Sequence, residues 1–182
     1  MINFRHSDIQ IYYTSFIREM NNIESFKLRN PNDVKIRAIL NIDIYTKATR
    51  LLEASIKHII YNCLVIKGLT DEELSSLSSR LKRFNNPEYS KIKQLVFDEL
   101  ELDIDEGLKA PLNAFSGRDK THLDQIVKNR HRNVHASEDS TTWFSSNNKN
   151  LTDFKNEFEG LVKILLFLDK IIYSDRSFTF TS

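Results

Sequence analysis

Hydrophobic residues recur at steps of three and four along most of this 182-residue chain, which is the spacing of amphipathic helices. Polar connectors and capping residues divide this pattern into separate segments. The segments that we expect to be helical are residues 7–22, 34–67, 70–84, 86–100, 108–115, 121–135 and 152–172. The pattern therefore predicts an all-α bundle of about five to seven helices, with no sheet beyond incidental strand pairing.

Capping signals set several of these boundaries. Ser7 with Gln10, and Thr70 with Glu73, have the spacing of a capping box at a helix start. Gly117 is expected to stop the short helix 108–115, because glycine readily adopts the left-handed backbone that ends helices. These signals set the predicted starts of the helices at residues 7 and 70 and the predicted end of the helix at residue 115.

Four other stretches leave specific questions for the structure. The run 34–67 is the longest, and the sequence leaves open whether residues 41–43 interrupt it. Residues 97–106 alternate acidic and aliphatic side chains but lack the Gly-centred spacing of a calcium loop, so we expect a connector or a helix end. The final segment has so wide an apolar face that it predicts contact with two helices or with a second subunit. Residues 174–182 are expected to be loosely ordered.

Composition places the chain among globular proteins of one domain, residues 1–182. Its 26 basic and 25 acidic residues give a net charge of +1, so any contact with nucleic acid must be local. The single Cys63 excludes an internal disulfide and is expected in the core, which fits a reducing compartment. Without a stretch of eighteen apolar residues, we expect a cytoplasmic protein with no membrane partner.

The segment 121–135 contains the most informative residues of the chain. Its apolar stripe consists of Leu123, Ile126, Val127 and Val134. On a helical wheel Arg130 lies only about 20° from Leu123, whereas Arg132 points to roughly the opposite side. A guanidinium on an apolar face must be paired or must open onto a cleft, so Arg130 differs in kind from the solvent-facing Arg132.

The sequence Arg130-His-Arg-Asn-Val-His135 resembles the R-x-x-x-x-H motif of HEPN domains, which are small all-α proteins found in RNases, toxins and abortive-infection systems. The surrounding residues are similar to the RiboL-PSP-like and abortive-infection groups of that family. Val134 and Ala136 replace the usual Ala and Gly of the motif. Ser137 stands where the toxins paired with nucleotidyltransferase antitoxins have a Tyr, which disfavours that branch.

The resemblance implies a HEPN-like bundle and a metal-independent endoribonuclease that leaves 2′,3′-cyclic phosphate ends. It further implies a homodimer in which two motifs face each other in one cleft. The expected partners are RNA, a second copy of the chain and an antitoxin or defence-system protein. No metal-binding or cofactor motif is present, so neither a metal nor a cofactor is expected.

The residue types of the motif suit this chemistry. A histidine with an unperturbed pKa near about 6.5 exchanges protons at neutral pH, and arginine offers a planar fork of donors to phosphate. The candidate catalytic residues are Arg130, His135 and His131; His131 either shares the proton transfer or orients His135. The candidate substrate-binding residues are Arg132, Asn133 and Glu53.

Three alternatives remain open at this stage. Glu53 is either a solvated helix charge or the group that neutralises the inward Arg130 across the bundle. The pair Trp143–Phe144 either anchors a loop to the core or offers a surface for base stacking. The chain as a whole is either a nuclease or a non-catalytic HEPN module for dimerisation or for RNA or nucleotide binding, since Arg and His near a helix end also complement its dipole.

Overall fold

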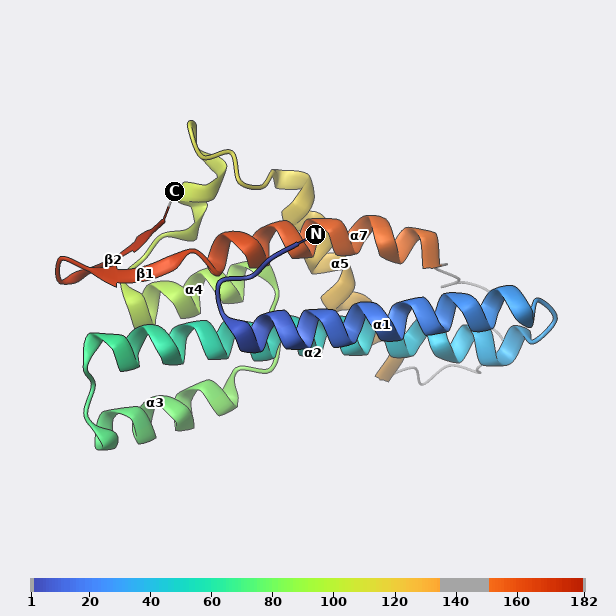
Figure 1. Ribbon diagram of the computed structural model, residues 1–182, viewed down its shortest axis with the longest axis horizontal. Coiled ribbons are helices and arrows are strands. Elements are labelled where there is room, and N and C mark those ends of the chain that lie inside the picture. Colours follow the sequence, from blue (N-terminus) through green and yellow to red (C-terminus); the bar gives the residue numbers. More distant parts are fainter. Residues whose placement is uncertain (1, 135–150, 182) are drawn as a thin grey trace.

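The computed structural model describes residues 2–134 and 151–181 and confirms the all-α prediction. Within these residues there are six α-helices, one 3₁₀ helix and one two-stranded sheet (Figure 1). The elements are α1 (Ser7–Arg29), α2 (Val34–Lys67), α3 (Asp71–Arg83), α4 (Tyr89–Leu100), η1 (Ile104–Leu108), α5 (Gly117–Val134), α7 (Leu151–Leu168), β1 (Ile171–Ser174) and β2 (Ser177–Phe180). None of the helices in these two ranges is both long and apolar enough to cross a membrane.

Helices α1 and α2 form a long antiparallel hairpin along one side of the molecule (Figure 1). Helix α2 is continuous over its 34 residues, which answers the question about residues 41–43. It ends where expected, at Gly68 with a left-handed φ of 92°. Helix α1 extends to Arg29, beyond the predicted end at residue 22, because Ile23 continues its buried face.

Helix α7 is the centre of the core. Its Phe158 ring lies 4.8 Å from Phe16 of α1, and its Phe154 ring lies 5.0 Å from Tyr45 of α2, measured between ring centroids. Its third neighbour is α5, which crosses α7 and then passes behind α1 and α2 in the view of Figure 1. The wide apolar face of the final helix is therefore covered within one chain, by more than the two helices expected.

Several other predicted boundaries were wrong. The final helix ends at Leu168 rather than at residue 172. The capping box of Ser7 and Gln10 is absent: His6 is the N-cap, and Gln10 Oε1 accepts a hydrogen bond from the Phe4 amide at 2.8 Å. Residues 108–115 are not a helix, because η1 ends at Leu108 and Asn113 has a left-handed φ of 36°.

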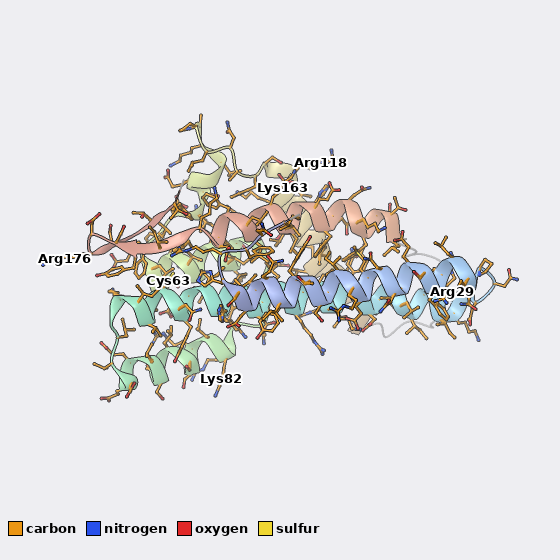
Figure 2. All side chains as sticks on the ribbon, in the orientation of Figure 1. Arg29, Cys63, Lys82, Arg118, Lys163 and Arg176 are labelled. Carbon is orange, nitrogen blue, oxygen red and sulfur yellow. The ribbon has the colours of Figure 1, made fainter. Side chains whose placement is uncertain are left out.

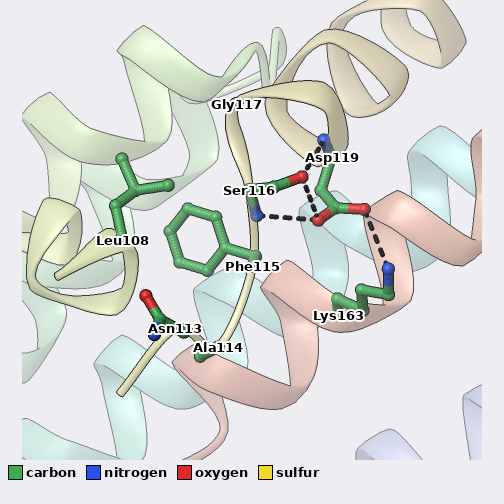
Figure 3. Close-up of a pocket in the computed structure, with 8 residues that line it drawn as sticks. All are labelled: Leu108, Asn113, Ala114, Phe115, Ser116, Gly117, Asp119 and Lys163. Atoms are coloured by element: carbon green, nitrogen blue, oxygen red, sulfur yellow. Dashed lines mark hydrogen bonds and ion pairs between the residues drawn. The ribbon is translucent and has the colours of Figure 1, made fainter. Parts of the chain in front are cut away.

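Gly117 begins α5 rather than ending the preceding segment. The reason is a reciprocal cap: Ser116 Oγ accepts from the Asp119 amide at 3.2 Å, and Asp119 Oδ2 accepts from the Ser116 amide at 2.7 Å (Figure 3). The capping box of Thr70 and Glu73 at the start of α3 is present as predicted.

The tail expected to be loosely ordered forms an antiparallel hairpin instead, in which Ile171 pairs with Phe180. The ring of Phe180 stacks on Phe167 of α7 with centroids 4.1 Å apart, which ties the hairpin to the core. Cys63 is 1% exposed, as predicted, and burial raises the pKa of its thiol to about 11. A thiol with so high a pKa is a poor nucleophile.

Candidate functional site

Helix α5 positions the candidate site through its buried stripe. Leu123, Ile126 and Val127 are fully buried, which confirms the apolar face predicted from their spacing. The Ser116–Asp119 cap fixes the start of the helix, and Lys163 of α7 donates to Asp119 at 3.2 Å (Figure 3). The orientation of α5, and with it the direction of Arg130, is therefore set by its packing and its cap.

Arg130 points away from solvent, as its place on the wheel predicts, and its side chain is 18% exposed. One amino group, Nη2, donates to the main-chain oxygen of Asn85 at 2.9 Å. The other, Nη1, lies 3.9 Å from Glu53 Oε2. The guanidinium thus lies between α2 and the connector of residues 84–88, which joins α3 to α4, and it retains an opening to solvent.

Glu53 is half-buried rather than fully solvated, with 22% of its side chain exposed. It accepts from Lys57, one turn further along α2, at 2.6 Å and faces Arg130 across the bundle. The pairing of Glu53 with Arg130 is therefore observed. At 3.9 Å this contact is an ion pair without a direct hydrogen bond.

The other motif residues follow Arg130 closely along the chain. His131, Arg132 and Asn133 belong to the last turn of α5. His135, together with the Trp143–Phe144 pair, lies outside the described residues. The structure thus brings Arg130 and Glu53 together, and helix geometry keeps His131 to Asn133 within about 4.5 Å of Arg130 along the helix axis.

The sequence did not indicate the role of Asn85. Its main-chain oxygen, rather than its side chain, holds Arg130, and a carbonyl contact leaves no signal in residue type. The sequence predicted a helix start at Asn86-Pro87, whereas α4 begins at Tyr89, so neither the full connector nor its contact with α5 was predicted.

A second polar contact on α2 was also missed. The Tyr45 hydroxyl donates to Glu157 Oε2 at 3.0 Å, and both residues are nearly fully buried. Burial, and then the neighbouring carboxylate of Glu157, raises the pKa of Tyr45 well above its usual range. Tyr45 and Glu53 are eight residues apart on α2, so this helix contacts polar groups of both α7 and α5.

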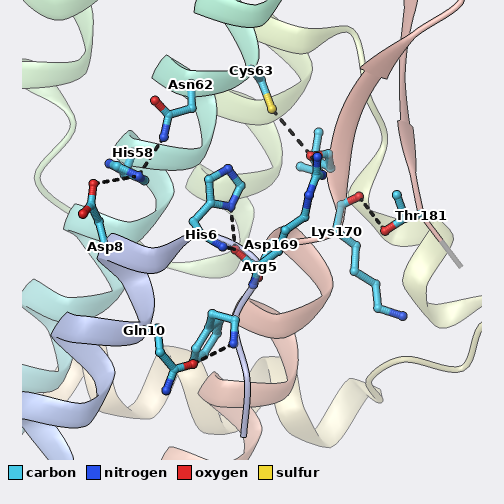
Figure 4. A network of polar contacts seen from close by, with 12 residues as sticks. Arg5, His6, Asp8, Gln10, His58, Asn62, Cys63, Asp169, Lys170 and Thr181 are labelled. Atoms are coloured by element: carbon cyan, nitrogen blue, oxygen red, sulfur yellow. Dashed lines mark hydrogen bonds and ion pairs between the residues drawn. The ribbon is translucent and has the colours of Figure 1, made fainter.

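Two histidines without an assigned role take part in a separate polar network (Figure 4). His6 Nδ1 lies 2.7 Å from the buried Asp169 Oδ1, and the Arg5 amide donates to the same carboxylate. His58 lies 2.7 Å from the Asn62 amide and 3.4 Å from Asp8. This network ties the N-terminal segment to the end of α7 and to α2.

Across the described residues no three His, Cys, Asp or Glu side chains converge as a metal site would require.

Comparisons with known proteins give no assignment for this chain. No family model, curated protein or solved structure matches it. The candidate site therefore rests on its own geometry, namely an inward arginine held by a carboxylate and a main-chain oxygen.

Proposed function

We propose that this chain is a metal-independent endoribonuclease of the HEPN type. The 2′-oxygen of RNA attacks the adjacent phosphorus while the bond from phosphorus to the 5′-oxygen breaks. A base removes the proton of the 2′-hydroxyl, and an acid protonates the departing 5′-oxygen. The products are a 2′,3′-cyclic phosphate end and a 5′-hydroxyl end.

The position of Arg130 is the observation that carries this proposal. Its guanidinium contacts Asn85 on one side and Glu53 on the other, and its side chain remains 18% exposed, so its direction is fixed before a substrate arrives. A preoriented cation of this kind stabilises the negative charge that develops on the phosphorane oxygens. Arginine also keeps its charge when partly buried, because the delocalised guanidinium is a very weak acid.

The proton transfers are assigned to His135, with His131 as a second acid or base or as an orienting group. Arg132, Asn133 and Glu53 are assigned to substrate binding, Glu53 by orienting Arg130. The proposal includes a homodimer that supplies a second motif. It places the protein in the cytoplasm, in phage defence or as a toxin, with an antitoxin or defence-system partner.

One observation favours a second candidate function. Arg130 already bonds Asn85 and faces Glu53, so its contacts also suit a purely structural link between α2, α5 and the 84–88 connector. Such a link would fit a non-catalytic module for dimerisation or for RNA or nucleotide binding. The two functions differ in whether a covalent bond of RNA is broken.

The test uses a short RNA and its fully 2′-deoxy counterpart, each incubated with the protein in EDTA. The nuclease proposal predicts cleavage of the RNA only, with cyclic phosphate ends identified by mass spectrometry. Cleavage of both strands would contradict 2′-hydroxyl attack. Binding of the RNA without any cleavage would favour the non-catalytic module.

A further inference from the structure

We propose that exposed cations around Arg130 bind the backbone of single-stranded RNA. They are Arg50 on α2, together with Lys82 and Arg83 at the end of α3, and we call them the cation track. This inference rests on the proposed function, for which it names the substrate class and the surface that receives it.

The hydrogen bond from Arg130 to Asn85 brings the end of α3 to the site. Lys82 and Asn85 are three residues apart, so their Cα atoms lie within about 11 Å of each other. Lys82 and Arg83 are both exposed, and Figure 2 shows Lys82 at the C-terminal end of α3. Two solvent-facing cations therefore directly precede the connector that holds Arg130.

Arg50 approaches the same site from α2. It precedes Glu53 by three residues, which is about 4.5 Å along the helix axis and about 60° around it. Its side chain is exposed, whereas Glu53 faces Arg130. The track thus has cations on α2 and at the end of α3, next to the connector that holds the guanidinium.

The charge balance of these segments differs from that of the whole chain. Residues 50–57 and 82–88 contain Arg50, Lys57, Lys82 and Arg83 against Glu53 and Glu88. With Arg130 this gives five cations against two carboxylates, in a chain whose net charge is +1. Within the described part of the chain, none of the three track cations has an ion-pair partner, whereas the neighbouring Arg80 is paired with Glu99 at 2.7 Å. Unpaired cations of this kind release counterions when they bind phosphate.

The partial burial of Arg130 favours a single strand over a duplex. Its side chain is 18% exposed, so a phosphate can reach only part of it while neighbouring phosphates contact the exposed track. A flexible single strand can adapt to both, whereas the phosphates of an A-form duplex lie on a stiff cylinder.

The experiment separates binding from cleavage by using a strand that cannot react. The probe is a fluorescent single-stranded oligonucleotide of about 12 nucleotides, with every 2′-hydroxyl methylated. Fluorescence anisotropy measures its binding to wild type and to the double variant Lys82→Gln/Arg83→Gln over a range of salt concentrations. The matched control, Arg118→Gln/Lys170→Gln, removes the same charge from two exposed positions outside the track. Arg118 is twelve residues before Arg130, about 18 Å along α5.

We expect the track variant to bind about tenfold more weakly, and its salt-dependence slope to be smaller by about 1.4. We expect the control to bind as wild type does. Adding Arg50→Gln should weaken binding further.

Equal weakening in both double variants would overturn the track, as would unchanged binding in the track variant. Equal affinity for a matched methylated duplex would overturn the single-strand assignment. If wild type does not cleave RNA but the track variant still binds the probe more weakly, only the nuclease proposal is contradicted. If wild type cleaves RNA but the track variant binds the probe as tightly as wild type, only this inference is contradicted.

Discussion

At the scale of single residues, Arg130 is the centre of this account. A guanidinium directed inward needs polar partners, and this one has a carbonyl and a carboxylate from two different elements. The sequence showed the inward direction because Arg130 shares the stripe of Leu123. It offered Glu53 as one possible partner, but it could not show Asn85, because the position of Asn85 depends on how α3 and α4 pack.

Glu53→Gln tests whether the ion pair orients Arg130. We expect the free energy of unfolding to fall by less than about 1 kcal/mol, since both partners are partly solvated. We expect the rate of RNA cleavage to fall about tenfold or more, because a misplaced catalytic group is costly. The control is Glu19→Gln. Glu19 forms an ion pair with Lys47 of α2, as Glu53 does with Lys57, but it does not face Arg130. Equal effects of the two variants on cleavage would contradict an orienting role for Glu53.

Asp105 provides a pH-dependent test of the fold. Partial burial raises the pKa of its carboxyl, but hydrogen bonds from Lys93, Tyr89 and Lys120 outweigh burial and hold that pKa well below its usual range. The stabilisation is therefore complete above the unfolded pKa of about 3.9 and is lost as the pH falls toward the folded pKa.

We expect Asp105→Asn to lower the free energy of unfolding near neutral pH by about 1–3 kcal/mol, as for hydrogen bonds to charged groups. The difference from wild type should shrink as the pH falls below about 4. Urea denaturation across this pH range measures it, with Glu106→Gln, which loses only an exposed pair with Lys109, as the control. A difference that grows at low pH would contradict the assignment.

The spacing of residues 97–106 excluded a calcium loop, but it could not show that lysines from α4 and α5 converge on the carboxylate of Asp105.

At the scale of elements, the crossing of α5 and α7 places the site. A Cβ built on Gly160 of α7 would lie 2.8 Å from His122 Cβ and 3.0 Å from Asp119 Cα, so only glycine fits at this crossing. We expect Gly160→Ala to lower the free energy of unfolding by about 1–3 kcal/mol, because backbone would have to move.

Gly117→Ala is the matched control, since nothing lies within 4 Å of a Cβ at that position. Thermal unfolding of both variants measures the effect. A stability loss in Gly117→Ala as large as that in Gly160→Ala would show that close packing is not the cause.

Helix boundaries show which elements the sequence could predict. Long periodic runs were predicted well, as α2 and α3 show, because each continues one buried face. Errors had a local cause in one place and a tertiary cause in another. The local cap of Ser116 and Asp119 makes Gly117 a helix start, and the stacking of Phe180 on Phe167 orders a tail whose terminal position suggested a loose end.

At the scale of the whole molecule, the proposed chemistry needs a second copy of the chain. The core itself is complete within one chain, since α7 is covered by α1, α2 and α5. We expect sedimentation velocity to show a dimer at micromolar concentration. In that dimer, Arg130 of each copy should lie near the two-fold axis. A monomer under these conditions would count against the dimer and against a shared catalytic cleft.

The most direct test of the nuclease proposal is the single-turnover rate of RNA cleavage in EDTA for wild type, Arg130→Ala and His135→Ala. His122→Gln, on the same helix but outside the motif, is the control for general damage to α5. We predict cleavage by wild type and by the control, and a rate about two to four orders of magnitude lower in the two motif variants. The nuclease proposal would be contradicted if His135→Ala cleaved RNA as fast as wild type. It would also be contradicted if His122→Gln lost as much of the cleavage rate as the two motif variants.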